Sequence, residues 1–138
     1  MEFDLSQHAQ AWRSRLQRFF DTELLPRHPA WQDSVRRNKP VPFMTELQQK
    51  ARAAGLWNLA LPDLAPDEPG TRLSNLDYAP LAEIMGRLPW ASEAFNCQPP
   101  DVPNMIALQH SANDEQKRRW LRPLLNGQTR SAFAMTEP

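Results

Sequence analysis

The sequence predicts an all-α protein, an up-and-down bundle of five or six helices followed by the first strand of a β-domain. Two observations predict the bundle. Apolar residues recur at helical spacing through most of the chain, and prolines and glycines separate these periodic stretches. A third observation, the alternation of small and large apolar residues over 131–135, indicates that a strand begins after the helices.

The first predicted helix runs from Asp4 to about Leu25. Its apolar residues fall on one face with arginine and glutamine between them, which is the pattern of an amphipathic helix. Pro26 is expected to end it, because proline lacks an amide hydrogen and clashes with the preceding turn. Residues 27–41 are polar and bordered by prolines, so we expect a loop held to the core by Trp31.

A second helix is predicted over residues 42–54. Pro42 suits its first turn, and Gly55 occupies the position of a helix-terminating glycine. The short apolar stretch that follows is expected to be buried. Residues 63–73 are then predicted to form a loop in solvent.

A third helix is predicted to begin after Ser74 and to continue to about residue 87. Ser74 and Asp77 have the spacing of a capping box, in which the serine side chain binds the amide three residues later. Pro80 lies within the same apolar pattern, so we expect a kink or a later start.

The last helices are shorter. Residues 91–97 and 101–110 each have the pattern of a short helix, and Asn113 with Gln116 predicts a capped helix after them. A helix stop signal near residues 126–128 precedes the change from helical spacing of apolar residues to the alternation over 131–135. We therefore place a domain boundary there.

Composition narrows the classes of partner. The chain carries 16 basic and 16 acidic residues, so nothing in its charge favours nucleic acid or an anionic membrane surface. A single cysteine, Cys97, excludes an internal disulfide and fits a reducing compartment. No apolar run approaches the roughly 18 residues that span a bilayer, and the acidic N-terminus is unlike a signal peptide. We therefore expect a cytoplasmic protein with no membrane or nucleic-acid partner.

The sequence contains no pattern of metal ligands. The three histidines are widely separated and lack a second ligand at helical spacing: His8, His28 and His110. Acidic residues one turn earlier balance the basic run Lys117–Arg119, which is typical of a solvated helix face. The five tryptophans are interpreted as core and interface anchors. We predict no metal site.

Three blocks of the sequence carry a family resemblance. The block from Phe133 to Pro138 reads Phe-Ala-Met-Thr-Glu-Pro, and it follows Asp114 to Gly127, a charged helix that ends in Leu-Leu-Asn-Gly. The order and spacing of these two blocks resemble the segment of the acyl-CoA dehydrogenase family that leads into its first signature. Leu76 to Arg87 is similar to a helix in a branch of that family with larger, more divergent substrates.

The resemblance implies a domain organisation. Residues 1–127 would be the N-terminal helical domain, and residues 128–138 would start the middle β-domain. The chain enters the signature and does not complete it, so we expect a fragment truncated within this motif.

The resemblance also implies an FAD-dependent flavoprotein of fatty acid metabolism that oxidises an acyl-CoA thioester to the 2,3-enoyl-CoA. In such enzymes a carboxylate base removes the α-proton while hydride leaves the β-carbon for flavin N5. The family places this base, a glutamate, in its C-terminal helical domain. We therefore assign no catalytic residue here and predict that the isolated chain is inactive. Family members pass electrons to an electron-transfer flavoprotein and are commonly homo-oligomers.

By the same resemblance, Phe133, Met135 and Thr136 are the expected cofactor-binding residues. The Thr136 hydroxyl would hydrogen-bond near flavin N5, where a small donor polarises the ring without steric block. Phe133 and Met135 would lie against the ring system. On residue type alone, the same three residues suit the inner face of a strand and the turn that follows it.

A substrate pocket is expected around Phe95, Asn96, Cys97, Gln98 and Met105, in the region where family members line the acyl-chain cavity. Such a cavity must be mostly apolar. Plain helical packing uses the same residue types, so both interpretations stay open. Cys97 has no histidine or basic residue near it in sequence, and we interpret it as a buried, inert thiol.

Two alternatives to the dehydrogenase remain. One is a stand-alone helical module that binds a partner, or a second copy of itself, through exposed apolar surface and has no catalytic role. The other is part of a related flavin oxidase or monooxygenase of the same architecture.

Overall fold

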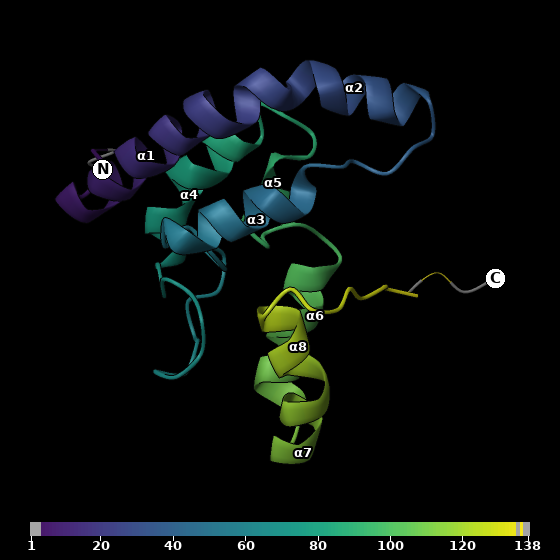
Figure 1. Cartoon of the computed structure of the whole chain (residues 1–138). Coiled ribbons are helices and arrows are strands. Elements are labelled where there is room, and N and C mark those ends of the chain that lie inside the picture. The colour runs from purple at the N-terminus through teal and green to yellow at the C-terminus, as the bar shows by residue number, and fades with distance from the viewer. Residues whose placement is uncertain (1–3, 135, 137–138) are drawn as a thin grey trace.

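The computed structural model describes residues 4–134 and 136, and every regular element among them is helical (Figure 1). The α-helices are α1 (Gln7–Phe19), α2 (His28–Arg36), α3 (Met44–Ala53), α4 (Asn75–Met85), α5 (Ala91–Ala94), α6 (Asp101–Ser111), α7 (Asp114–Gln116) and α8 (Arg122–Leu125). Short π and 3₁₀ turns join α1 to α2 and α7 to α8 without a break. The described residues therefore form six continuous helical stretches, which confirms the all-α prediction.

The first helical stretch does not end at Pro26, as the sequence predicted. A π-helical turn, Phe20–Leu24, and a 3₁₀ turn, Leu25–Arg27, follow α1, and α2 continues directly from them. The Leu25 amide donates to the carbonyl five residues back, and the His28 amide donates to the carbonyl three residues back. This change of hydrogen-bond register accommodates the proline inside a continuous helix. The predicted loop is therefore largely α2.

Other helix boundaries follow the local signals. Ser74 caps α4, since its Oγ accepts the amide of Asp77 at 3.1 Å. The helix starts immediately after this cap and includes Pro80, so the proline does not delay its start. Gly55 has φ of +67° just beyond α3, and Asn113 makes both hydrogen bonds of a capping box at α7.

Three of the helices alternate in direction. Arg15 near the middle of α1 donates to the carbonyl that follows α3, whereas Glu23, just beyond α1, pairs with Lys50 of α3 at 2.9 Å. These contacts make α1 and α3 antiparallel. Ser6, which caps α1, donates to Asp77 in the first turn of α4 at 2.9 Å, so α1 and α4 begin at the same end. The arrangement is the predicted up-and-down one.

Two hydrophobic clusters form the interior. The larger lies among α1, α3, α4 and α5 and includes the fully buried Phe95. The smaller joins α6 to α8 around Met105. Residues 63–73 were predicted to be a solvent loop, but Leu64 and Leu73 are buried. The loop is therefore pinned to the interior by two leucines that no periodic pattern marked.

The tryptophans divide between core and surface. Trp57 and Trp90 are each 3% exposed, and Trp31 on α2 stacks against Trp90 with ring centroids 6.3 Å apart. These three are anchors, as predicted. Trp120 is 46% exposed and lies on a surface that the next section describes.

The C-terminal segment leaves the helices in an irregular conformation. Residues 131–134 form no strand, and the described part of the chain contains no other strand with which they could pair. A strand gains its hydrogen bonds from a neighbour, so alternation of residue types alone does not produce one. The predicted strand is therefore not formed within this segment. Met135 lies outside the described residues.

Candidate functional site

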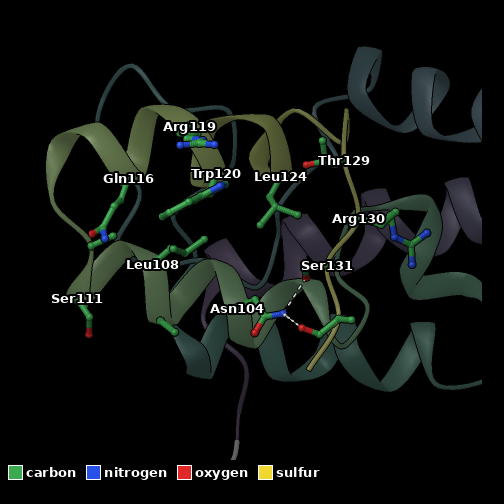
Figure 2. A pocket seen from close by; sticks show the side chains of 13 residues that line it. Asn104, Leu108, Ser111, Gln116, Arg119, Trp120, Leu124, Thr129, Arg130 and Ser131 are labelled. Carbon is green, nitrogen blue, oxygen red and sulfur yellow. Dashed lines mark hydrogen bonds between the residues drawn. The ribbon is translucent and has the colours of Figure 1, made fainter. Parts of the chain in front are cut away.

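A groove of about 660 Å³ lies between α6 and the helical stretch that contains α7 and α8 (Figure 2). Leu108 of α6 and Trp120 of the opposite stretch face each other across it, and Thr129 to Ala132 border one side. Arg119 and Arg130 also line it. Pockets for small ligands commonly measure about 300–1,000 Å³ and are mostly apolar with a few polar groups. The groove is therefore a candidate ligand site.

The C-terminal segment borders the groove because α6 binds it. Asp101 Oδ1 accepts both the amide and the hydroxyl of Ser131, at 2.7 and 2.6 Å. Asn104 donates to Ser131 Oγ at 2.8 Å and to the carbonyl of Ala132 at 3.2 Å, as the dashed lines in Figure 2 show. Arg130 Nε donates to Asp101 Oδ2 at 2.7 Å. The four residues Asp101, Asn104, Arg130 and Ser131 form what we call the Asp101 clamp.

The expected flavin contacts lie just beyond this clamp. Phe133 is 57% exposed, and Thr136 is exposed as well. Met135, the third expected contact, lies outside the described residues. An aromatic ring and a hydroxyl on irregular backbone are thus available to a ligand and are not part of the hydrophobic interior.

The five expected pocket residues are all buried, and none of them is among the residues that line the groove. Phe95 packs edge-on against Phe19 in the larger cluster, and Met105 belongs to the smaller one. Asn96 bonds to Asn58 between the clusters. In the part of the chain that the structure describes, these residues serve packing and internal hydrogen bonds, and their role in a substrate pocket stays a prediction.

Gln98 belongs to the surroundings of the clamp. Its Nε2 donates to Asp101 Oδ2 at 2.6 Å, and this acceptor-only carboxylate fixes which end of the amide faces it. The opposite end, Oε1, is buried without a hydrogen-bond partner among the described residues.

Cys97 is a buried thiol whose Sγ lies 3.3 Å from the carbonyl oxygen of Phe95. Burial raises the pKa of Cys97 to about 12, because a thiolate is poorly solvated in the interior. The group is therefore protonated at neutral pH, which agrees with the interpretation of an inert thiol.

Sequence reasoning did not identify the residues of the clamp. Asp101 follows two prolines at a helix start, where an acidic residue is ordinary, and Ser131 lies 30 residues further on. No local signal connects the two positions. The sequence also did not show that Trp120 lines this groove, because a helical wheel does not reveal which face of a helix meets a neighbour.

No helix among residues 4–134 and 136 is long and apolar enough to cross a membrane. Within the same residues, no group of three or more potential ligands from His, Cys, Asp and Glu is placed to hold a metal ion.

Comparison with known proteins places this architecture in a family. Residues 6–128 match the model of the acyl-CoA dehydrogenase N-terminal domain. The probable acyl-CoA dehydrogenase FadE2 of Mycobacterium tuberculosis is 42% identical over an alignment that covers 100% of this chain and 34% of that protein. Acyl-CoA dehydrogenase family member 10 of Mus musculus is 46% identical over 90% of this chain and 12% of its own length. A solved Mycobacterium abscessus structure, assigned as an acyl-CoA dehydrogenase, superposes with a TM-score of 0.86 and 42% identity, covering 99% of this chain and 36% of that one.

The chain therefore belongs to the acyl-CoA dehydrogenase family, as the resemblance of its sequence blocks indicated. It corresponds to the N-terminal helical domain and spans 34% of the length of FadE2 and 36% of the solved relative.

Proposed function

We propose that this chain supplies the N-terminal helical domain of an FAD-dependent acyl-CoA dehydrogenase, which oxidises an acyl-CoA thioester to the 2,3-enoyl-CoA. The observation that carries the proposal is the match of residues 6–128 to the N-terminal domain of this family. The exposed segment beyond the helices, which carries the residues expected to meet the cofactor, supports it.

The residues present fit a flavin ring. Phe133 offers an exposed aromatic face, and Thr136 offers an exposed hydroxyl three residues later. With Met135 they are the residues that would hold the ring. When bound, FAD supplies the acceptor for the hydride that leaves the substrate β-carbon. The contribution of this chain is to hold the segment in place and to offer the Thr136 hydroxyl as a donor.

We assign the catalytic base to none of the residues in this chain. The clamp aspartate accepts hydrogen bonds from Ser131, Arg130 and Gln98, so its lone pairs are already engaged. We expect the isolated chain to be inactive as a dehydrogenase, because a carboxylate base positioned at the α-carbon is needed for the proton transfer.

A visible absorption titration of the purified chain with FAD tests the cofactor assignment, with intact-mass spectrometry on the same sample. Saturable binding with a shifted, resolved flavin band would support the assignment and mean that the helical domain and the segment with Thr136 already form a usable half-site. Thr136→Val removes only the hydroxyl and is expected to weaken or abolish the shift. Thr45→Val, on an exposed face of α3, is the matched control and should behave as wild type.

Free-flavin behaviour of the wild-type chain at the correct mass would contradict flavin binding by this domain and favour the interaction-module alternative. A shift of equal size in both threonine variants would show that the Thr136 hydroxyl does not contribute to flavin binding. A full-length relative that reduces oxygen directly would favour the oxidase or monooxygenase alternative.

A further inference from the structure

Asp101 is a buried carboxylate that accepts hydrogen bonds from two segments of the chain. Its side chain is 1% exposed at the start of α6. Gln98, before the helix, donates to Oδ2, while Arg130 and Ser131, from beyond α8, donate to Oδ2 and Oδ1. A buried charge is tolerated when donors of this kind surround it. This carboxylate therefore links the helical domain to the segment that follows it.

The clamp holds backbone as well as side chains. Asp101 accepts a hydrogen bond from the amide of Ser131. Asn104, three residues further along the same helix face, donates one to the carbonyl of Ala132. Backbone is thus fixed at two successive residues. Arg130 is itself held from the other side by Glu93, with 2.6 Å between Nη1 and Oε1.

The ionisation of Asp101 suits this role. Burial by itself raises the pKa of Asp101, but the hydrogen bonds from Ser131 and the positive charge of Arg130 lower it overall. The group is therefore a carboxylate at neutral pH. A carboxylate accepts all of these donors, whereas a neutral amide would have to turn its own donor toward one of them.

We propose that Asp101 is a positioning residue which, with Asn104, sets the path of residues 131–134 and so prepares Phe133, and the Thr136 that follows, to meet the flavin. The inference rests on the proposed function. Thr136 lies five positions after Ser131, a reach of at most about 18 Å in an extended chain, so fixing Ser131 limits where Thr136 can lie. A segment ordered beforehand loses less conformational freedom when a ligand binds, which strengthens binding without adding a contact.

Backbone NMR relaxation of the ¹⁵N-labelled chain tests the positioning directly. In the wild type, the Ala132 and Ala134 amides are expected to have order parameters near those of the helices, about 0.85. In Asp101→Asn they are expected to fall below about 0.6 while the helical amides keep their values. Asn104→Ala, at a half-buried site that leaves the carboxylate in place, should loosen Ala132 and Ala134 by a smaller amount. Asp33→Asn removes a carboxylate that pairs with Arg37 on the exposed side of α2, away from the clamp, and is the matched control.

Flavin binding is measured on the same four proteins by FAD titration, followed by amide shifts and by the visible band. The affinity is expected to fall about tenfold in Asp101→Asn, in keeping with the loss of charge-assisted hydrogen bonds, and to stay unchanged in Asp33→Asn. Unchanged order parameters in both clamp variants would overturn the proposal. A loosened segment with undiminished FAD affinity would overturn its link to flavin. A wild-type chain that is ordered but binds no FAD would contradict flavin binding by this domain alone, and the order parameters of the variants would still decide whether the clamp holds the segment.

Discussion

Asn96 donates its side-chain amide to Asn58 Oδ1 over 2.7 Å, and both asparagines have a left-handed backbone, with φ of 55° and 50°. Asn96 also donates to the carbonyl of Leu124 at 3.0 Å, and Asn58 donates to the carbonyl of Leu125 at 2.9 Å. Asparagine adopts this backbone region more readily than most residues. The pair therefore joins the two hydrophobic clusters through loops that only a few residue types could form.

Replacing Asn96 by alanine should destabilise the fold strongly. The substitution leaves the Leu124 carbonyl and Asn58 Oδ1 without this donor in the interior, and it puts alanine, which adopts positive φ less readily than asparagine, at a φ of 55°. Together these effects are expected to lower the unfolding free energy by about 2–4 kcal/mol. Urea denaturation followed by circular dichroism measures the change. Asn38→Ala, at an exposed residue with φ of 51°, is the control and should lose only about 1 kcal/mol. Equal losses in Asn96→Ala and Asn38→Ala would mean that the hydrogen bonds of Asn96 do not stabilise the fold.

Gly127 directs the chain from α8 toward the Asp101 clamp, and its replacement by alanine should be unfavourable on two counts. Its φ is +61°, and an added Cβ would lie 2.9 Å from Trp57 Cζ2. Trp57 cannot easily give way, because its Nε1 donates to a buried carbonyl at 2.8 Å and Arg52 covers its ring. We expect Gly127→Ala to lower the unfolding free energy by about 2–4 kcal/mol.

Thermal unfolding of Gly127→Ala beside Gly86→Ala measures this effect. Gly86 follows α4 with φ of −62°, and an added Cβ there meets a carbonyl oxygen at 3.3 Å without requiring a left-handed backbone. A melting temperature for Gly127→Ala as high as that of Gly86→Ala would show that the turn is more adaptable than its geometry indicates.

The sequence predicted the features that depend on neighbours along the chain. Ser74 and Asn113 cap helices through amides three positions away, and Gly55 ends a helix through its own φ. Such contacts are encoded within one turn, so composition and spacing suffice. The sequence blocks at 114–127 and 133–138 likewise indicated the family.

Features that depend on distant partners could not be predicted. Pro26 suggested a helix end, but π and 3₁₀ turns satisfy the backbone around it, and Phe20 and Leu24 of the π turn are buried in the larger hydrophobic cluster. The clamp needs Asp101 and Ser131, 30 residues apart, to meet across the end of a helix. The strand expected after residue 130 would need a pairing partner, and the described residues offer none.

Cys97 should resist thiol reagents in the folded chain. It is 7% exposed, and burial raises its pKa to about 12, so thiolate is scarce at pH 8. Ellman's reagent at pH 8 is expected to react at a negligible rate without denaturant and to release one equivalent of thionitrobenzoate in 6 M guanidinium. Asn96→Ala removes the hydrogen bond to Asn58 next to Cys97. Cys97 in this variant should react faster under native conditions through local opening. Rapid, stoichiometric reaction of the wild type would mean that this loop is open in solution and would favour its assignment to a pocket wall.

The stability of the fold should fall in acid partly through Asp101. Because the pKa of Asp101 is lowered in the folded state, the unfolded chain binds this proton more readily. The stabilisation is therefore fully present above the unfolded pKa, about 3.9, and is lost as the pH falls through the folded pKa. At pH 7 we expect Asp101→Asn to lower the unfolding free energy by about 1–3 kcal/mol, as for the loss of hydrogen bonds to a buried charged group.

Urea titrations of the wild type, Asp101→Asn and Glu93→Gln from pH 7 to pH 2.5 separate this contribution from the others. The wild-type and Asp101→Asn curves should converge toward the acid end, since protonation of the wild-type carboxyl weakens the same bonds that the substitution removes. Glu93→Gln retains Asp101 and should keep most of the wild-type slope. A constant gap between the wild type and Asp101→Asn across the whole range would mean that the loss is one of packing, and that the charge of Asp101 does not hold Arg130 and Ser131 against α6.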